Sequence, residues 1–180
     1  ISATLFFVSP LQINLQVPFE LEGNTTAVMI IEANGLQSDP IQFNLSRANP
    51  GIFTFNQQGS GAGAILHNSD GSRVSTTNPC VNQEYVQIYV TGLGPLSQAM
   101  RTGCAAPYPP TTLYHAVDPI IVTVNGVVAN VAFSGLAPGF VGLYQINVQI
   151  PQGIHPANDV QIVITMGGIQ SNIATIVIGS

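Results

Sequence analysis

The sequence has no lysine and no tryptophan, and charged residues make up only 6% of its 180 positions. A typical soluble domain carries about 25% charged residues. Proteins that bind nucleic acid or an anionic membrane need a basic surface, and the three scattered arginines, Arg47, Arg73 and Arg101, do not form one. These partners are therefore excluded. The sequence also lacks any run of about 18 apolar residues, so we expect no membrane span.

Cysteine is scarce as well, with only Cys80 and Cys104 in the chain. They flank the strand-like run EYVQIYVTG at residues 84–92. An even cysteine count in a charge-poor, exported chain predicts one disulfide, which would stabilise the fold by about 3 kcal/mol. Two free thiols are the alternative. Two cysteines alone form no zinc site, and we expect no metal and no cofactor.

With so few charges, the surface consists mainly of Ser, Thr, Asn, Gln and Gly. Such a surface suits a protein that is covered by glycans or packed into an assembly; an ordinary secreted β-domain is the alternative reading. Two sequons, Asn24-Thr25-Thr26 and Asn44-Leu45-Ser46, make Asn24 and Asn44 candidate N-glycosylation sites. The chain begins at Ile1 without a signal-peptide pattern, so we expect a mature or partial product outside the cell.

Alternation with a period of two residues dominates the sequence and predicts an all-β protein. In LQINLQV (11–17) and YQINVQI (144–150), apolar side chains alternate with Gln and Asn. The dipeptides Asn34-Gly35, Asn125-Gly126 and Gly167-Gly168 separate alternating runs and predict tight hairpins.

One repeat divides the chain. QINLQVP at 12–18 matches QINVQIP at 145–151, and GLQS at 35–38 matches GIQS at 168–171, both 133 positions apart. Two strand-like runs, at 119–126 and 127–133, precede the second copy, but only the run at 3–8 precedes the first. We therefore predict two immunoglobulin-like β-sandwich modules, an incomplete one at 1–60 and a complete one at 61–180.

Residues suited to catalysis are scattered. The eight acids lie mostly at expected strand ends and turns, and His67, His115 and His155 lie on separate segments. Neither the paired carboxylates of a glycosidase nor a Ser-His-Asp order is present, so we predict that the protein is not an enzyme. Tyr108 and Tyr114 are the only obvious pair of exposed aromatic residues for stacking a sugar.

Several motifs together resemble a known family. They are VSPLQINLQVPFEL, NPGIFT, GAGAILHNSDGS, IYVTGLGP, SGLAPGFVGLYQINVQIP and GGIQSN. In this succession the chain is similar, over nearly its whole length, to the uncharacterised C-terminal domain found in Solibacter and other Acidobacteria. The resemblance implies an extracellular all-β module at the end of secreted or surface proteins, with no known enzymatic activity. Family members carry a strand like VTVNG before the first VSP motif, and that strand is absent here.

These observations predict a subunit of an extracellular bacterial surface fibre or pilus-like filament, a homopolymer assembled head-to-tail by β-strand donation. We expect the N-terminal run to be the donor, because it precedes the incomplete module and has no expected partner within its own chain. Its candidate residues are Ala3, Leu5, Phe6, Phe7 and Val8. The C-terminal run at 173–178 is a second donor candidate. The alternative function is a non-polymeric module of a larger surface protein that binds or presents glycans.

Overall fold

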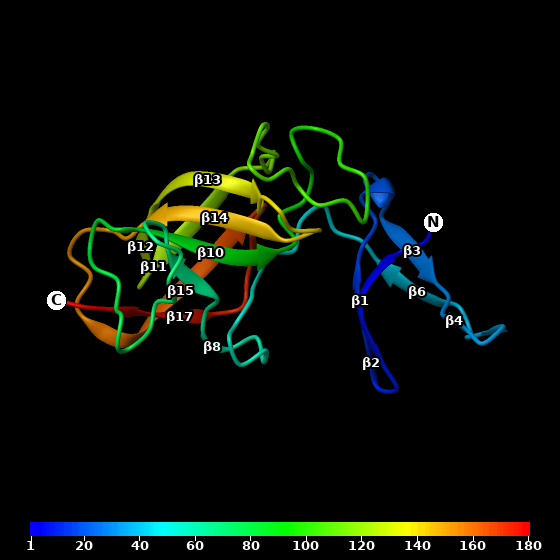
Figure 1. Cartoon of the computed structure of the whole chain (residues 1–180), viewed down its shortest axis with the longest axis horizontal. Helices are drawn as coiled ribbons and strands as arrows, with labels where there is room; N and C mark the ends of the chain where they lie inside the picture. The colour runs from blue at the N-terminus through cyan, green and yellow to red at the C-terminus, as the bar shows by residue number, and fades with distance from the viewer.

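The computed structural model describes residues 1–180 and confirms the prediction of an all-β protein. The only helical element is a single 3₁₀ turn, η1 (Phe19–Leu21). No helix therefore has the length and apolar character needed to cross a membrane. Residues 48–180 form two stacked sheets, here called the sandwich, and residues 1–47, the N-terminal segment, form hairpins at one end of it (Figure 1).

The strands of the N-terminal segment are β1 (Thr4–Ser9), β2 (Gln12–Gln16), β3 (Thr26–Met29), β4 (Glu32–Ala33), β5 (Leu36–Gln37) and β6 (Ile41–Asn44). The strands of the sandwich are β7 (Gly51–Ile52), β8 (Gly61–Ala62), β9 (Ile65–His67), β10 (Tyr85–Thr91), β11 (Ile120–Val124), β12 (Val127–Val128), β13 (Asn130–Leu136), β14 (Tyr144–Gln149), β15 (Ala157–Met166), β16 (Ile169–Gln170) and β17 (Ala174–Ile178).

The sandwich contains two sheets that are almost entirely antiparallel. One sheet has the strand order β13-β14-β10-β7, with β9 also paired to β10. The other has the order β12-β11-β15-β17-β8, with β16 paired to β15. Only β17 and β8 run parallel. Tight turns of the expected kind connect β11 to β12 and β15 to β16, where Asn125, Gly126, Gly167 and Gly168 all take positive φ angles.

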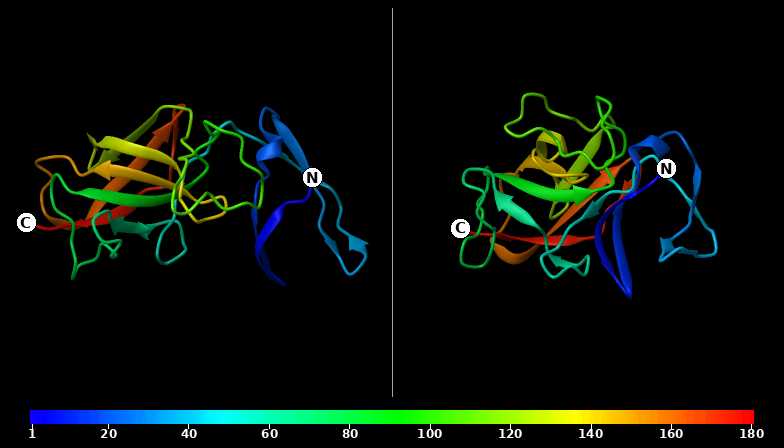
Figure 2. Two further views of the ribbon diagram at one scale, coloured as in Figure 1. Left: turned by 45° about the horizontal axis from the view of Figure 1, so that its top comes forward. Right: turned by 45° about the vertical axis from the view of Figure 1, so that its right-hand side comes forward.

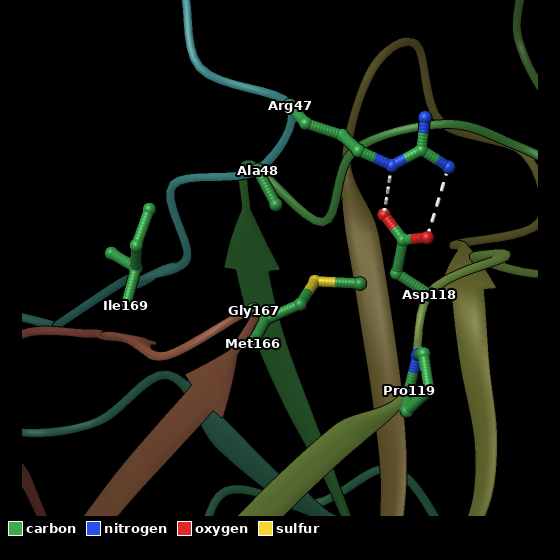
Figure 3. A pocket seen from close by; sticks show the side chains of 7 residues that line it. All are labelled: Arg47, Ala48, Asp118, Pro119, Met166, Gly167 and Ile169. Atoms are coloured by element: carbon green, nitrogen blue, oxygen red, sulfur yellow. Dashed lines mark hydrogen bonds and ion pairs between the residues drawn. The ribbon is translucent and has the colours of Figure 1, made fainter.

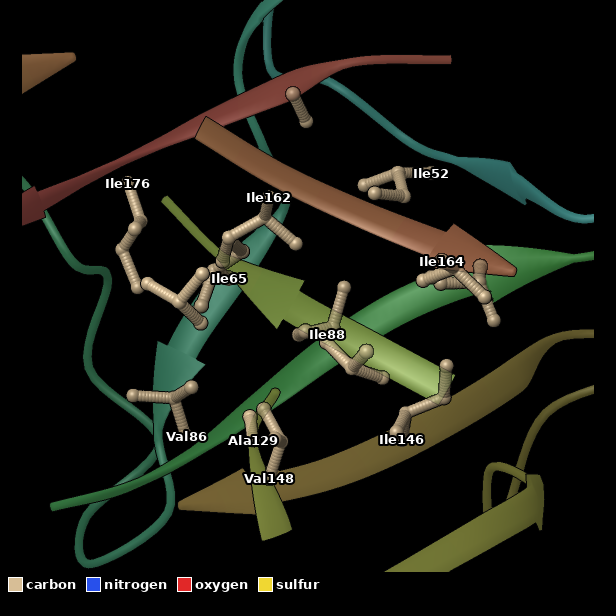
Figure 4. Close-up of a cluster of buried hydrophobic side chains, with 14 of the residues drawn as sticks. Ile52, Ile65, Val86, Ile88, Ala129, Ile146, Val148, Ile162, Ile164 and Ile176 are labelled. Atoms are coloured by element: carbon tan, nitrogen blue, oxygen red, sulfur yellow. The ribbon is translucent and has the colours of Figure 1, made fainter. Parts of the chain in front are cut away.

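Alternate side chains from both sheets meet in a single hydrophobic core (Figure 4). Val86 and Ile88 of β10, Ile146 of β14, and Ile162 and Ile164 of β15 are each 0% exposed. Full burial of a side chain of this size contributes about 1.5–3 kcal/mol. The period-two pattern of the sequence therefore translates directly into the two inner faces of the sandwich.

The N-terminal segment has no comparable core. Its strands form three separate two-stranded ribbons, β1-β2, β3-β6 and β4-β5. Among residues 1–47 only Gln16 and Pro18 are buried, and none belongs to the hydrophobic core. Figure 2 shows these ribbons from two further directions, standing beside the sandwich without covering either of its sheets.

The sequence repeat is also a structural repeat, because the strands of both copies pair in the same register. β3 and β6 pair Ala27 with Phe43, Val28 with Gln42 and Met29 with Ile41. At positions 133 residues later, β15 and β17 pair Val160 with Ile176, Gln161 with Thr175 and Ile162 with Ala174. The β4-β5 and β15-β16 hairpins also correspond in register. Even a side-chain contact repeats: Gln12 Nε2 donates to Asn14 Oδ1, and Gln145 Nε2 donates to Asn147 Oδ1, both at 2.7 Å.

The repeat includes β1, which corresponds to β13. β1 pairs with β2 as β13 pairs with β14, and both pairs are irregular at the same place, between Leu5 and Phe7 in one copy and between Val131 and Phe133 in the other. The N-terminal segment therefore contains counterparts of β13, β14, β15, β16 and β17.

Residues 48–60, which the sequence division assigns to the first module, pack with the sandwich. Ile52 of β7 pairs with Val90 of β10 and is only 3% exposed. Ala48 also belongs to the hydrophobic core. By its contacts, the sandwich therefore begins near residue 48.

Two equivalent isoleucines test whether the N-terminal segment lacks a core. Ile164 is 0% exposed and its counterpart Ile31 is 39% exposed. We expect Ile164→Ala to lower the free energy of unfolding by about 2–5 kcal/mol, because it leaves a cavity, and Ile31→Ala to lower it by less than about 1 kcal/mol. Urea denaturation followed by circular dichroism measures both changes. Equal losses would contradict the structural difference between the copies.

Candidate functional site

The most distinctive surface of the molecule is an apolar face of the N-terminal segment, here called the uncovered face. It consists of the positions whose counterparts are buried in the sandwich: Leu11, Ile13, Leu15, Val17, Ala27, Met29, Ile31, Ala33, Ile41, Phe43 and Leu45. Leu11 is 97% exposed and its counterpart Tyr144 is 6% exposed; Val17 is 52% exposed and Ile150 is 0% exposed. Six members are half-buried, and the exposed members are Leu11, Val17, Ile31, Ala33 and Ile41. Exposed apolar side chains in such number are typical of an interaction site.

Two strand edges beside this face have no partner. In the sandwich, β14 lies between β13 and β10, and β15 lies between β11 and β17. In the N-terminal segment, β2 pairs only with β1, and β3 pairs only with β6. The places that β10 and β11 occupy in the sandwich are thus empty beside β2 and β3. Unpaired edges present rows of free N–H and C=O groups that bind further strands.

The opposite side of β2 attaches the N-terminal segment to the sandwich. The Gln16 side chain accepts a hydrogen bond from the Gly103 N–H at 2.9 Å. A Cβ atom at Gly103 would lie 2.6 Å from Thr4 Oγ1, so this close approach requires glycine. Thr102 Oγ1 accepts from the Phe19 N–H at 2.9 Å and donates to Glu20 Oε2 at 2.6 Å.

A charged contact reinforces the same junction (Figure 3). The Arg47 guanidinium donates to both carboxylate oxygens of Asp118, at 2.7 and 2.9 Å. The hydrogen bond from Arg47 holds the pKa of Asp118 below its usual value. The shallow pocket around this pair is otherwise lined mainly by Ala48, Pro119, Met166, Gly167 and Ile169. Because Arg47 is largely exposed, the ion pair orients the linker more than it stabilises it.

The predicted disulfide is wrong: both cysteines are free. Cys80 is buried, and its carbonyl accepts from the Gly179 N–H near the C-terminus, whereas Cys104 is exposed in the loop beside the N-terminal segment. Cys80 thus lies beside the last strand near the C-terminus, and Cys104 follows Gly103, which contacts Gln16 of the N-terminal segment. The C-terminus and the N-terminal segment lie at opposite ends of the molecule (Figure 1). Burial raises the pKa of the Cys80 thiol to about 12, so it is a packed apolar side chain without thiolate reactivity.

The candidate donor residues lie in a hairpin. Leu5, Phe6, Phe7 and Val8 are about half exposed and Ala3 is partly buried. The expectation that this run has no partner in its own chain is wrong, because β1 pairs with β2. The C-terminal run is not free either: β17 lies between β15 and β8 inside a sheet.

The remaining sequence candidates lie apart from the uncovered face. Asn24 and Asn44 are both exposed, so both sequons are accessible. Tyr108 is 79% exposed, whereas Tyr114 packs against the hydrophobic core. The two rings therefore have different environments and do not share one flat surface.

His67 is buried in the sandwich and connects two of its segments by hydrogen bonds. It is 7% exposed, and its ring nitrogens contact the Glu84 carboxylate and, at 3.2 Å, the Asn78 carbonyl. No cluster of three or more metal-ligating side chains is present. Sequence reasoning missed both this pair and the Thr102–Gly103 anchor, since neither lies in a recognisable motif and both join distant parts of the chain.

Comparison with protein-family models, with curated proteins and with solved structures finds no match to this chain. The class of site is therefore defined by the geometry alone: an apolar face flanked by two open strand edges.

Substitution of the anchoring threonine tests how the N-terminal segment is attached. Thr102→Val removes the hydroxyl contacts to the Phe19 N–H and to the Glu20 carboxylate. We expect trypsin to cut faster after Arg47 and Arg101, which flank the junction. Cleavage after Arg73, inside the sandwich and stacked on Phe55, is the internal control. Unchanged relative rates at the three sites, measured by mass spectrometry, would show that Thr102 is not an anchor.

The His67–Glu84 pair predicts a dependence of stability on pH. Burial alone lowers the pKa of His67, but the hydrogen bonds to Glu84 and Asn78 and the nearby carboxylates outweigh it, so the pKa is raised. A raised pKa means that the folded state binds the proton more tightly than the unfolded state. We expect the free energy of unfolding to be greatest below about pH 6.5 and to fall as the pH rises through the folded pKa. His67→Gln should flatten this dependence between about pH 6 and 8; an unchanged slope would contradict the assignment.

Proposed function

We propose that this chain is a non-enzymatic structural protein of the cell exterior, a subunit of a bacterial surface fibre that assembles by β-strand donation. In this proposal residues 1–47 are one half of an immunoglobulin-like module, here called the half-module, and a neighbouring subunit donates its β1 strand to it. The sandwich is a complete module of the same type.

One observation carries the proposal: the uncovered face repeats the buried face of the sandwich position by position. Ile31, Ile41 and Val17 are between 39% and 52% exposed, and their counterparts Ile164, Ala174 and Ile150 are each 0% exposed. Contact between these apolar side chains and water is unfavourable, so such a surface favours association with another polypeptide. The open edges of β2 and β3 supply the backbone groups for strand addition.

Within this proposal the run at residues 3–8 remains the candidate donor. Since β1 already pairs with β2, donation means exchange: β1 of one subunit takes the place of β1 in the next. Repeated head-to-tail, this exchange forms a filament. The tight turn at residues 10–11, where Leu11 is 97% exposed, is the hinge that must open.

An extracellular location is consistent with the proposed surface fibre. Charged residues are only 6% of the chain, so the molecule has little charge repulsion to keep its copies apart. The resemblance to the C-terminal domains of acidobacterial surface proteins supports export, and the exposed Asn24 and Asn44 are candidate sites for covalent glycans.

A charge placed on the donor strand tests the fibre directly. Phe6 is 54% exposed on β1, and Phe140, on the sandwich, is 52% exposed and provides a matched control. We expect Phe6→Asp to abolish filaments, because a carboxylate cannot enter an apolar strand interface, and Phe140→Asp to leave them intact. Circular dichroism should show an unchanged sandwich in both variants.

Negative-stain electron microscopy and light scattering provide the readout. Filaments that persist with Phe6→Asp would show that β1 is not the donor strand. If the unmodified chain forms only 18.9 kDa monomers, the fibre itself is wrong.

A further inference from the structure

The sandwich shows how the uncovered face is covered when a module is complete. β10 lies beside β14 and pairs Val86 with Val148, Ile88 with Ile146 and Val90 with Tyr144. β11 lies beside β15 and pairs Val122 with Ile164 and Val124 with Ile162. Strands β7 to β12, which come first along the chain, are here called the front half of the module, and strands β13 to β17 are called the back half. Each half contributes strands to both sheets.

The shared register transfers this arrangement to the N-terminal segment. At positions 133 residues earlier, Val148, Ile146 and Tyr144 become Leu15, Ile13 and Leu11. In the same way, Ile164 and Ile162 become Ile31 and Met29. A strand like β10 therefore fits beside β2, and a strand like β11 fits beside β3, each with its apolar side chains on the same side as the uncovered face, which it extends.

This chain has no such strands to spare. β10 and β11 are paired on both sides within the sandwich, and their inward side chains are 0% exposed. Residues 1–180 contain two back halves and only one front half, so a second copy would have to remove strands of this region from its own core to supply the missing ones. The occupant is therefore a front half that lies outside these 180 residues.

The lack of charge on the uncovered face favours a partner strand that is also uncharged. All eleven residues of the uncovered face are uncharged and apolar, and the polar side chains of β2 are Gln12, Asn14 and Gln16. A strand that alternates Val or Ile with uncharged polar residues, as β10 does, meets no unpaired charge there. A basic or acidic partner would have to bury a charge without a counter-ion.

We propose that the half-module binds the front half of a further module of the same type, with one β10-like strand on the open edge of β2 and one β11-like strand on the open edge of β3. This inference rests on the proposed function, in which residues 1–47 are one half of an immunoglobulin-like module. It adds the chemistry of the partner and the register of both strands, at a surface separate from the exchanged β1.

Two synthetic peptides copied from the sandwich act as probes. One is EYVQIYVTG (84–92), and the other is PIIVTVNG (119–126). Fluorescence anisotropy with the full chain should show saturable binding of each labelled peptide, without competition between the two. Peptides of the same composition with the apolar residues grouped together and the polar residues grouped together break the alternation and should not bind.

Substitutions on each edge assign the two binding sites. Ile13→Asp should weaken binding of the 84–92 peptide by about ten-fold or more and leave the 119–126 peptide unaffected, because it places a charge under the first strand alone. Met29→Asp should have the converse effect. Gln12→Asp and Val28→Asp are matched controls on the opposite faces of the same strands and should change neither affinity.

The outcomes separate this inference from the fibre. Absence of binding up to about 1 mM peptide, or binding that Ile13→Asp and Met29→Asp do not change, overturns the inference. A chain that dimerises and thereby excludes both peptides overturns it in favour of a second copy. Filaments formed by a chain that binds neither peptide leave the fibre standing without this partner. Peptide binding by a chain that never forms filaments supports the partner and overturns the fibre.

Discussion

The structure depends on one constraint: each half of this fold is apolar on one side and must be covered by its complement. Alternate residues of β14 and β15 direct their side chains into the space between the two sheets, and β10 and β11 extend those sheets and add their own inward side chains to the same core. The hydrophobic effect acts on the pair of halves and not on either half alone. The N-terminal segment repeats the strands and register of the back half without its cover, so the pattern that builds the core in one copy produces an association surface in the other.

The junction fixes where that surface faces. Gln16 and Thr102 connect the polar side of β2 and the η1 turn to a loop of the sandwich. Because side chains alternate along a strand, attachment through Gln16 directs Leu15 and Val17 away from that contact. The Arg47–Asp118 pair fixes the linker at the same end. The sandwich thus holds the N-terminal segment with the open edges of β2 and β3 unpaired.

Sequence alone predicted what depends on local pattern. The alternation in QINLQ and QINVQ predicted β2 and β14, and GLQS and GIQS marked equivalent hairpins. It failed where the outcome depends on distant contacts. The disulfide between Cys80 and Cys104 is absent because Cys80 pairs with the strand that ends at Ile178, whereas Cys104 follows Gly103, which contacts the N-terminal segment. The β1-β2 hairpin was missed because its turn, at residues 10–11, has neither glycine nor asparagine. The anchor at Thr102 and Gly103 has no motif at all.

The most direct measurement is hydrogen–deuterium exchange on the unassembled chain, comparing equivalent strands in the two copies. Strands β2 and β3 each lack a second partner strand, so we predict that their amides exchange at least about a hundred-fold faster than those of β14 and β15. Equal protection of β2 and β14, and of β3 and β15, in a monomeric chain would mean that the N-terminal segment is already complete. That result would contradict the conclusion that β2 and β3 have open edges and an uncovered apolar face.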